Sequence, residues 1–337
     1  MTTNILDGTR VYLSGPMDFV GSRVIEKFLG WRSILSPILR ALKITVLDPW
    51  NKPTIKGHKN YGQEGVVYSK EEYEKDFWTN DETRARFETD FWETVHIDLR
   101  MVDLADFIIT FVPTNIYSVG TVHEIVTARL QIKPVLMISP PVKYDFFPEI
   151  AKLPDDTKKL LKFYGLKENP KGIPSQWYGN IVGGHYFFDG FGWEALELKS
   201  NDFYQRLIED VLRNAEPEKK NEEKYKQWKK VKTWVSESKE LQNLTGSVLD
   251  HVRFLEGEEG LLAKELKNPN EKNRKYFWYN MPYTPKRSVL YQIFNIASGN
   301  IPPRLQIFSH LDEDGEMQYK SYESTDDSWL LISHEDI

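Results

Sequence analysis

The chain has 337 residues, of which 40% are hydrophobic and 13% aromatic, so it can build cores of ordinary size and is not globally disordered. Its net charge of −6 argues against a protein that coats nucleic acid or a membrane surface, and the absence of cysteine excludes disulfides, thiolate metal sites and a cysteine nucleophile. No stretch approaches the roughly 20 apolar residues of a membrane span, and residues 1–10 lack the apolar segment of a signal peptide. We therefore expect a cytoplasmic protein with no membrane partner.

The first 50 residues follow a strand–helix–strand pattern. Arg10–Leu13 is predicted to be a strand that leads into a loop containing Gly15, where the missing side chain lets the backbone approach a ligand closely. An amphipathic pattern over residues 24–42 predicts a helix, and Ile44–Leu47 predicts a second strand that ends at Asp48. A crossover of this length requires the two strands to be parallel.

A polar segment and a helix follow. Residues 51–78 are rich in Gly, Lys and Tyr and have no hydrophobic period, which predicts an insertion or a lid. Residues 79–103 carry an apolar stripe at helical spacing, and Asp98 lies near the carboxyl end of this predicted helix.

A second strand–helix–strand unit forms the centre of the sequence. The apolar, β-branched run Phe107–Val112 predicts a buried strand, the pattern from Thr121 predicts a helix, and Pro134–Ile138 predicts the next strand. The fold class is therefore α/β, a flavodoxin- or Rossmann-like parallel sheet with helices on both faces. Such sheets bind ligands at the carboxyl ends of their strands. Glu124, one turn into the central helix, is positioned to face that crevice and is the candidate functional residue.

The rest of the chain differs in composition and in its predicted elements. We expect a first domain over residues 1–215, a charged linker containing Pro217 at residues 216–223, and a small α+β domain over residues 224–337. In this last part, helices are predicted over residues 225–240 and 246–266 and a hairpin over 305–332. The sequence assigns it no role.

Three motifs of the first domain resemble the nucleoside 2-deoxyribosyltransferase family, which includes the 2′-deoxynucleoside 5′-monophosphate N-glycosidases. The motifs are Val11–Pro16, Asp98-Leu99 leading into Leu104–Ile109, and Ser118–Ile125. The resemblance covers residues 10–139 apart from the insertion at 51–78. Each motif is common by itself, and only their order and spacing within one α/β domain carry the resemblance.

The resemblance implies an enzyme that attacks the anomeric carbon of a nucleoside or nucleotide. Glu124 would be the nucleophile of a covalent glycosyl-enzyme, as in retaining glycosidases. Asp98 would hold a sugar hydroxyl or serve the proton transfers, and Tyr12 and Gly15 would line the pocket. The chemistry needs no metal or other cofactor. Because family members often complete the pocket across a subunit interface, the resemblance also implies a homo-oligomer.

One departure from the transferases bears on the substrate. Members that take free nucleosides carry an acidic residue six positions before the nucleophile, whereas here that position is Ser118, as in members that take 5′-monophosphates. A hydroxyl and the backbone amides of the helix start near Gly120 would bind a phosphate that an acid would repel. This favours a nucleotide substrate, whose base would meet Asp48 at the end of the second strand.

Simpler interpretations and other functions stay open. Glu124 is also an ordinary residue for the first turn of a helix, Asp98 for an exposed helix face, and Ser118 for a turn. The same site would suit an NAD-type glycohydrolase, or a non-catalytic nucleotide-sensing module whose C-terminal domain binds a partner. Basic and aromatic residues alternate in Lys224–Lys232 and Arg274–Tyr279, as in proteins that bind single-stranded nucleic acid. A solvated helix face and packed aromatic side chains explain them as well, and the net negative charge makes nucleic acid the less favoured partner.

Overall fold

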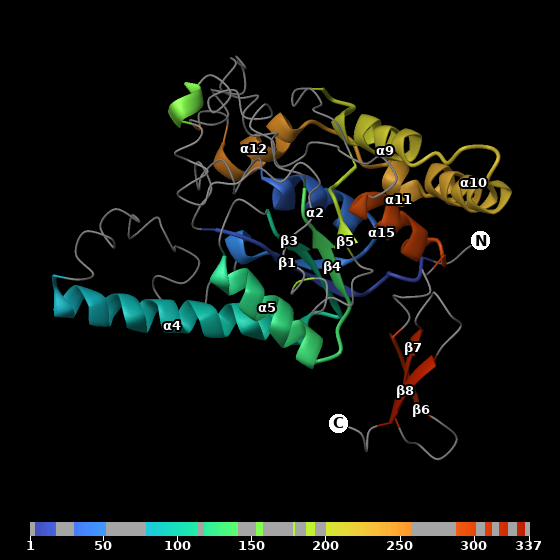
Figure 1. Cartoon of the computed structure of the whole chain (residues 1–337). Helices are drawn as coiled ribbons and strands as arrows, with labels where there is room; N and C mark the ends of the chain where they lie inside the picture. Colours follow the sequence, from blue (N-terminus) through green and yellow to red (C-terminus); the bar gives the residue numbers. More distant parts are fainter. Residues whose placement is uncertain are drawn as a thin grey trace.

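The computed structural model describes a central parallel sheet with helices on both sides (Figure 1). Its described residues are 4–17, 30–51, 79–113, 118–140, 153–157, 178, 187–192, 200–257, 260, 288–300, 307–311, 317–322 and 329–333. The predicted insertion or lid, apart from residue 51, and the aromatic segment Arg274–Tyr279 lie outside the described residues.

The central sheet has five parallel strands in the order β2-β1-β3-β4-β5. This is the strand order of the flavodoxin-like fold, which confirms the predicted fold class. The strands are β1 (Arg10–Ser14), β2 (Thr45–Leu47), β3 (Phe107–Phe111), β4 (Val135–Ile138) and β5 (Phe187–Phe188).

Alternation along the strands decides which residues meet which helices, because successive side chains of a strand point to opposite faces of the sheet. Val11 and Leu13 of β1 share an apolar cluster with α2 (Trp31–Ala41) on one face. Tyr12 belongs to a second cluster on the other face, with α4 (Asp81–Leu104) and α5 (Val119–Leu130). Figure 1 shows these helices on opposite sides of the sheet.

Further helices extend the layer on the α2 side of the sheet (Figure 1). Buried side chains from all of them belong to the same cluster as α2. They are α9 (Phe203–Asn214), α10 (Glu222–Glu237), α11 (Lys239–Gln242), α12 (Val248–Glu256) and α15 (Val289–Ala297). Within the described part of the chain, no helix combines the length and apolarity that a membrane crossing requires.

The charged segment 216–223 connects α9 to α10, and hydrogen bonds join residues before this segment to residues after it. The indole of Trp228 in α10 donates a 2.9 Å hydrogen bond to the carbonyl of Leu212 in α9. The backbone N–H of Ile5 donates to the carbonyl of Ala297 at the end of α15, over 3.2 Å. The predicted linker therefore does not coincide with a break in the core, and the described helices beyond it pack on the α/β domain.

The end of the chain holds a separate antiparallel sheet of three strands. β6 (Ile307–Leu311) and β7 (Met317–Tyr322) form the predicted hairpin, and β8 (Trp329–Ser333) pairs with β7 as a third strand. The sequence pattern predicts only the hairpin, so β8 is an additional strand of this sheet.

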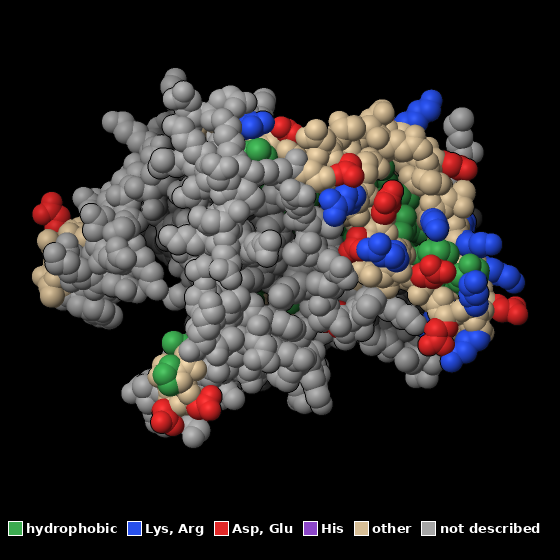
Figure 2. Space-filling view, turned by 90° about the horizontal axis from the view of Figure 1, so that it is seen from above, with side chains coloured by type: hydrophobic (Ala, Val, Ile, Leu, Met, Phe, Trp, Pro, Cys, Tyr) green, Lys and Arg blue, Asp and Glu red, His purple; other side chains and the backbone are tan. Residues whose placement is uncertain are grey.

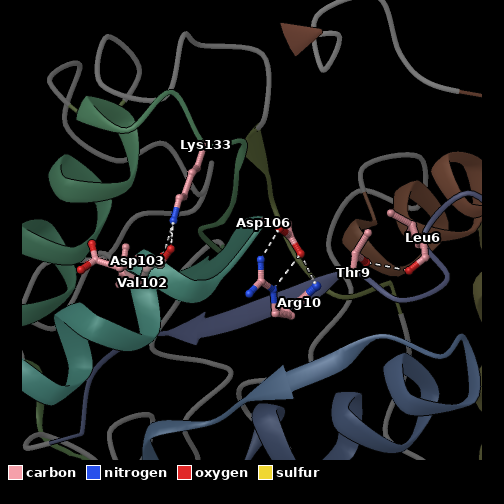
Figure 3. Close-up of polar contacts among 7 residues, drawn as sticks. All are labelled: Leu6, Thr9, Arg10, Val102, Asp103, Asp106 and Lys133. Atoms are coloured by element: carbon pink, nitrogen blue, oxygen red, sulfur yellow. Dashed lines mark hydrogen bonds and ion pairs between the residues drawn. The ribbon is translucent and has the colours of Figure 1, made fainter. Parts of the chain in front are cut away.

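Polar contacts fix the sheet at its amino edge (Figure 3). The Arg10 guanidinium donates to both carboxylate oxygens of Asp106, at 3.2 and 3.0 Å, and the backbone N–H of Arg10 donates to the same group at 2.7 Å. These bonds hold the pKa of Asp106 below its usual range. Nearby, the Lys133 ammonium donates to the carbonyls of Val102 and Asp103 at the end of α4. The starts of β1 and β3 are thereby held in register, with the candidate site at the opposite edge.

Candidate active site

The carboxylate of Glu124 is held by two hydroxyl groups of β1. The Tyr12 phenol donates to Oε1 over 2.6 Å, and the Ser14 hydroxyl lies 2.5 Å from Oε2. Tyr12 and Ser14 are two positions apart on a strand, so both point to the face of the sheet that α5 covers. The hydroxyl of Thr110, opposite Ser14 on β3, donates to Ser14 Oγ over 3.3 Å, which directs the Ser14 proton to Glu124. Both oxygens of the half-buried carboxylate are therefore oriented by fully buried donors.

Tyr12 also links the two predicted catalytic carboxylates. Burial raises the pKa of the Tyr12 phenol well above its ordinary value, and the charges of Glu124 and Asp98 and the hydrogen bond to Glu124 raise it further. The phenol therefore stays protonated and remains a donor at physiological pH. Asp98, in α4, is half-buried, and its charge acts on the same phenol. The structure thus brings Glu124, Tyr12 and Asp98 to one place.

Gly15 lies directly after β1, where a side chain would have little room. A Cβ at this position would be 3.0 Å from Nη2 of Arg32, 3.3 Å from the Trp31 ring and 3.4 Å from Cβ of Phe111. Arg32 is fully buried and donates to the carbonyls of Leu13, at 2.9 Å, and Gly15, at 2.7 Å. The absence of a side chain at Gly15 therefore leaves room for Arg32 at the end of β1, and its place in the pocket lining stays a prediction.

Ser118 and Gly120 lie at the start of the helix that carries Glu124. Ser118 is the residue before the first turn, and its hydroxyl is 2.7 Å from the hydroxyl of Thr121. Gly120 is exposed, and among the described residues a Cβ there would meet nothing within 4 Å. The described residues leave Gly120 uncovered at this helix start, and the phosphate site there stays a prediction.

Asp48 has a local contact of its own. Its carboxylate accepts a 2.9 Å hydrogen bond from the backbone N–H of Trp50 in the short helical turn Pro49–Asn51, and it is buried. It follows β2, the neighbour of β1, so it lies at the carboxyl edge of the sheet like Ser14. This bond shapes the turn, and it does not join Asp48 to the Glu124 group.

Ser14, Thr110 and Arg32 are further residues of this site that were not predicted from the sequence. For Ser14 a signal was present, because a residue two positions after Tyr12 on a strand must share its face. For Thr110 the signal needs the pairing of β1 with β3, and for Arg32 it needs the packing of α2 on the sheet. In the parts of the chain that the structure describes, no three His, Asp or Glu side chains converge as a metal site.

Comparisons with known proteins leave the chain without a family. No family model matches it, and no curated protein is similar to it in sequence. Among solved structures it is similar to a conserved protein from Enterococcus faecalis V583, at 14% identity and a TM-score of 0.29, over 53% of this chain and 89% of that one. A similarity this low carries no argument about function.

Proposed function

We propose that the protein is an enzyme that cleaves or transfers the N-glycosidic bond of a (deoxy)nucleoside 5′-monophosphate or nucleoside, with Glu124 as the nucleophile. The observation that supports this most directly is the carboxylate of Glu124 held by the Tyr12 and Ser14 hydroxyls at the carboxyl edge of a parallel sheet. A carboxylate in a fixed orientation at a ligand-binding edge suits attack on a sugar carbon. The resemblance of the three motifs to the deoxyribosyltransferase family adds to this support.

In the proposed reaction, an oxygen of Glu124 bonds to the anomeric carbon while the bond from that carbon to the base nitrogen breaks. The nitrogen keeps the electron pair and takes up a proton, so the base leaves neutral. Water or a second base then attacks the same carbon, and the carboxylate leaves with the electron pair of its ester bond. In the first step the proton on the base comes from solvent water. Asp98, charged and near Tyr12, is the candidate to accept the proton of the attacking water or base in the second step.

The proposed substrate carries a 5′-phosphate. Ser118 offers a hydroxyl where an acid would repel the phosphate, and the exposed Gly120 leaves the first turn of α5 accessible. Backbone N–H groups at a helix start favour an anion. The proposed pocket is completed by a second copy of the chain, as the resemblance implies. A sedimentation measurement that finds only a 39.5 kDa species would contradict that oligomer.

The test is release of free base from a panel of nucleosides, 5′-monophosphates and NAD, each with and without a second base as acceptor. We expect release from a monophosphate, and its loss in Glu124→Gln, which keeps the size of the side chain and removes its charge. Glu209→Gln, at an exposed glutamate of α9, is the matched control. Release from NAD would make the protein a glycohydrolase of larger nucleotides. Tight nucleotide binding with no release from any substrate would contradict the proposal and favour a sensor.

A further inference from the structure

Arg32 is a fully buried arginine that contacts the main chain on both sides of Ser14. From α2, its Nε donates to the carbonyl of Leu13 at 2.9 Å and its Nη2 to the carbonyl of Gly15 at 2.7 Å. The guanidinium is planar and its donors diverge at fixed angles. Two bonds to carbonyls two residues apart therefore fix the orientation of the peptide units around Ser14, and with it the direction of the Ser14 side chain.

The neighbours of Arg32 leave it little freedom to move. Its guanidinium lies 4.9 Å from the centre of the Trp31 ring, and that ring packs at 5.9 Å from Phe111 and 5.6 Å from Phe191. A buried charge in a close-packed cluster is retained only where its hydrogen bonds are good. The arrangement holds the end of β1 rigidly from the face of the sheet opposite Glu124.

The charge of Arg32 also acts on the Tyr12 phenol that donates to Glu124. The charged groups that act on the Tyr12 phenol, the hydrogen-bond donor to Glu124, are Glu124 itself, Asp98 from α4 and Arg32 from α2. Other titratable groups on the elements packed there are Tyr178, which packs against the same cluster, and His123 and Arg129 on α5. Asp98 opposes a second negative charge beside it, whereas a cation favours one. Arg32 lowers the pKa of the Tyr12 phenol, whereas the charges of Glu124 and Asp98 raise it.

We propose that Arg32 is a positioning residue for Glu124: it fixes Ser14 in the orientation that donates to the carboxylate, and its charge keeps that carboxylate ionised beside Asp98. Its effect on the rate of base release rests on the proposed function. Its effect on the ionisation of Glu124 does not, and can be measured on the protein without substrate.

The experiment follows the side-chain carboxyl signal of Glu124 by carbon-13 NMR as the pH changes, with the signal assigned by its loss in Glu124→Gln. In Arg32→Met, which keeps the length of the side chain and removes its charge, we expect the titration midpoint of Glu124 to rise by at least about one pH unit. Arg32→Lys restores the charge without the planar pair of donors, so its midpoint should lie between those of Arg32→Met and the wild type. Arg40→Met, at an exposed arginine of the same helix, should leave the midpoint unchanged.

A second comparison tests the route through Ser14. Ser14→Ala should raise the midpoint by itself, and Arg32→Lys should add less to it in the Ser14→Ala background than in the wild type. Equal midpoints in the wild type, Arg32→Lys and Ser14→Ala would overturn the inference, and these two variants stand even if Arg32→Met does not fold. If the midpoints shift while no substrate releases a base, the proposed function is wrong and the role of Arg32 holds. If base is released and the midpoints do not shift, the proposed function holds and the role of Arg32 is wrong.

Discussion

At the scale of single residues, the Tyr12 hydroxyl is the donor whose removal disturbs the site least in other respects. Tyr12→Phe keeps the buried ring and removes the 2.6 Å bond to Oε1 of Glu124. A hydrogen bond to a charged group contributes roughly 1.5–3 kcal/mol, so we expect kcat/KM for base release to fall by about 10- to 100-fold. Steady-state kinetics on the best monophosphate of the panel measures this. An unchanged kcat/KM would mean that Tyr12 does not orient the reacting carboxylate.

The two predicted pocket glycines should respond in opposite ways to the same substitution. Gly15→Ala places a Cβ 3.0 Å from Nη2 of Arg32, and overpacking of this kind lowers stability by about 1–3 kcal/mol. Gly120→Ala adds a methyl group in open space within α5 and should stabilise the protein by roughly 0.5–1 kcal/mol. Denaturant unfolding of both variants tests this pair. Equal stabilities of the two would contradict the packing described around Gly15. A raised KM in Gly120→Ala would place the substrate beside it.

How far sequence reasoning reaches at this scale depends on how local the signal is. Glu124 follows a strand and a loop, and Tyr12 lies in a strand next to a glycine, so both could be named from neighbours in the chain. Arg32 could not, because its role depends on α2 packing across the end of β1, which no spacing within the sequence specifies. Asp48 shows the converse, since its place at a strand end was predictable and its bond to the Trp50 amide was not.

At the scale of elements, α12 begins with a reciprocal pair of hydrogen bonds. The Ser247 hydroxyl accepts from the backbone N–H of Asp250 at 3.1 Å, and the Asp250 carboxylate accepts from the backbone N–H of Ser247 at 2.9 Å. Loss of such a cap lowers stability by about 1 kcal/mol, so Ser247→Ala should do so in denaturant unfolding. Ser236→Ala, at an exposed serine inside α10, is the control and should change stability by less than about 0.5 kcal/mol. Equal effects of the two would show that the cap does not hold α12.

The basic helix α10 shows why a charge pattern alone does not identify a nucleic-acid surface. Its lysines are exposed, but Trp228 is buried, and Lys232 lies over the Trp228 ring at 4.9 Å. A buried indole cannot stack on a base, so packing explains Trp228. Tyr225, which is half-exposed, stacks on Trp228 with ring centres 5.5 Å apart. On the right of the view in Figure 2, the side where α9 and α10 lie in Figure 1, cationic and acidic side chains are interspersed.

At the scale of the whole molecule, the apolar core on the α2 side of the sheet crosses the predicted domain boundary. Residues of β1 and α2 share one cluster with Val231 in α10, Val252 in α12 and Ile293 in α15. Helices that share a core unfold together, so we expect one thermal transition, with the same midpoint by far- and near-ultraviolet circular dichroism. Two separate transitions would contradict this and favour the independent domain at residues 224–337. The predicted boundary rests on composition alone, and composition indicates that a connection is exposed but not which surfaces pack across it.

The buried tyrosines make the stability of the whole molecule depend on pH on the alkaline side. Burial raises the pKa of Tyr204 and of Tyr291 above the ordinary value of 10.0, as it does for Tyr12. In the unfolded chain these phenols lose their protons near pH 10, whereas in the folded protein they keep them. The contribution of these protonated phenols to the free energy of unfolding is therefore complete below pH 10. It is lost as the pH rises above 10 toward the pKa of each phenol in the folded protein.

Tyr204→Phe isolates one of these groups. The Tyr204 hydroxyl is buried and has no hydrogen-bond partner among the described residues, so its removal should raise the free energy of unfolding at pH 7 by about 1 kcal/mol. Because phenylalanine cannot ionise, the advantage of the variant should widen between pH 10 and 11. Urea unfolding at pH 7, 9 and 10.5 measures both effects, with Tyr225→Phe at a half-exposed position of α10 as the control. An advantage that does not grow with pH would mean that the Tyr204 phenol ionises as readily in the folded chain as in the unfolded one. The burial of Tyr204 in the core argues against that outcome, because it raises the pKa of the phenol.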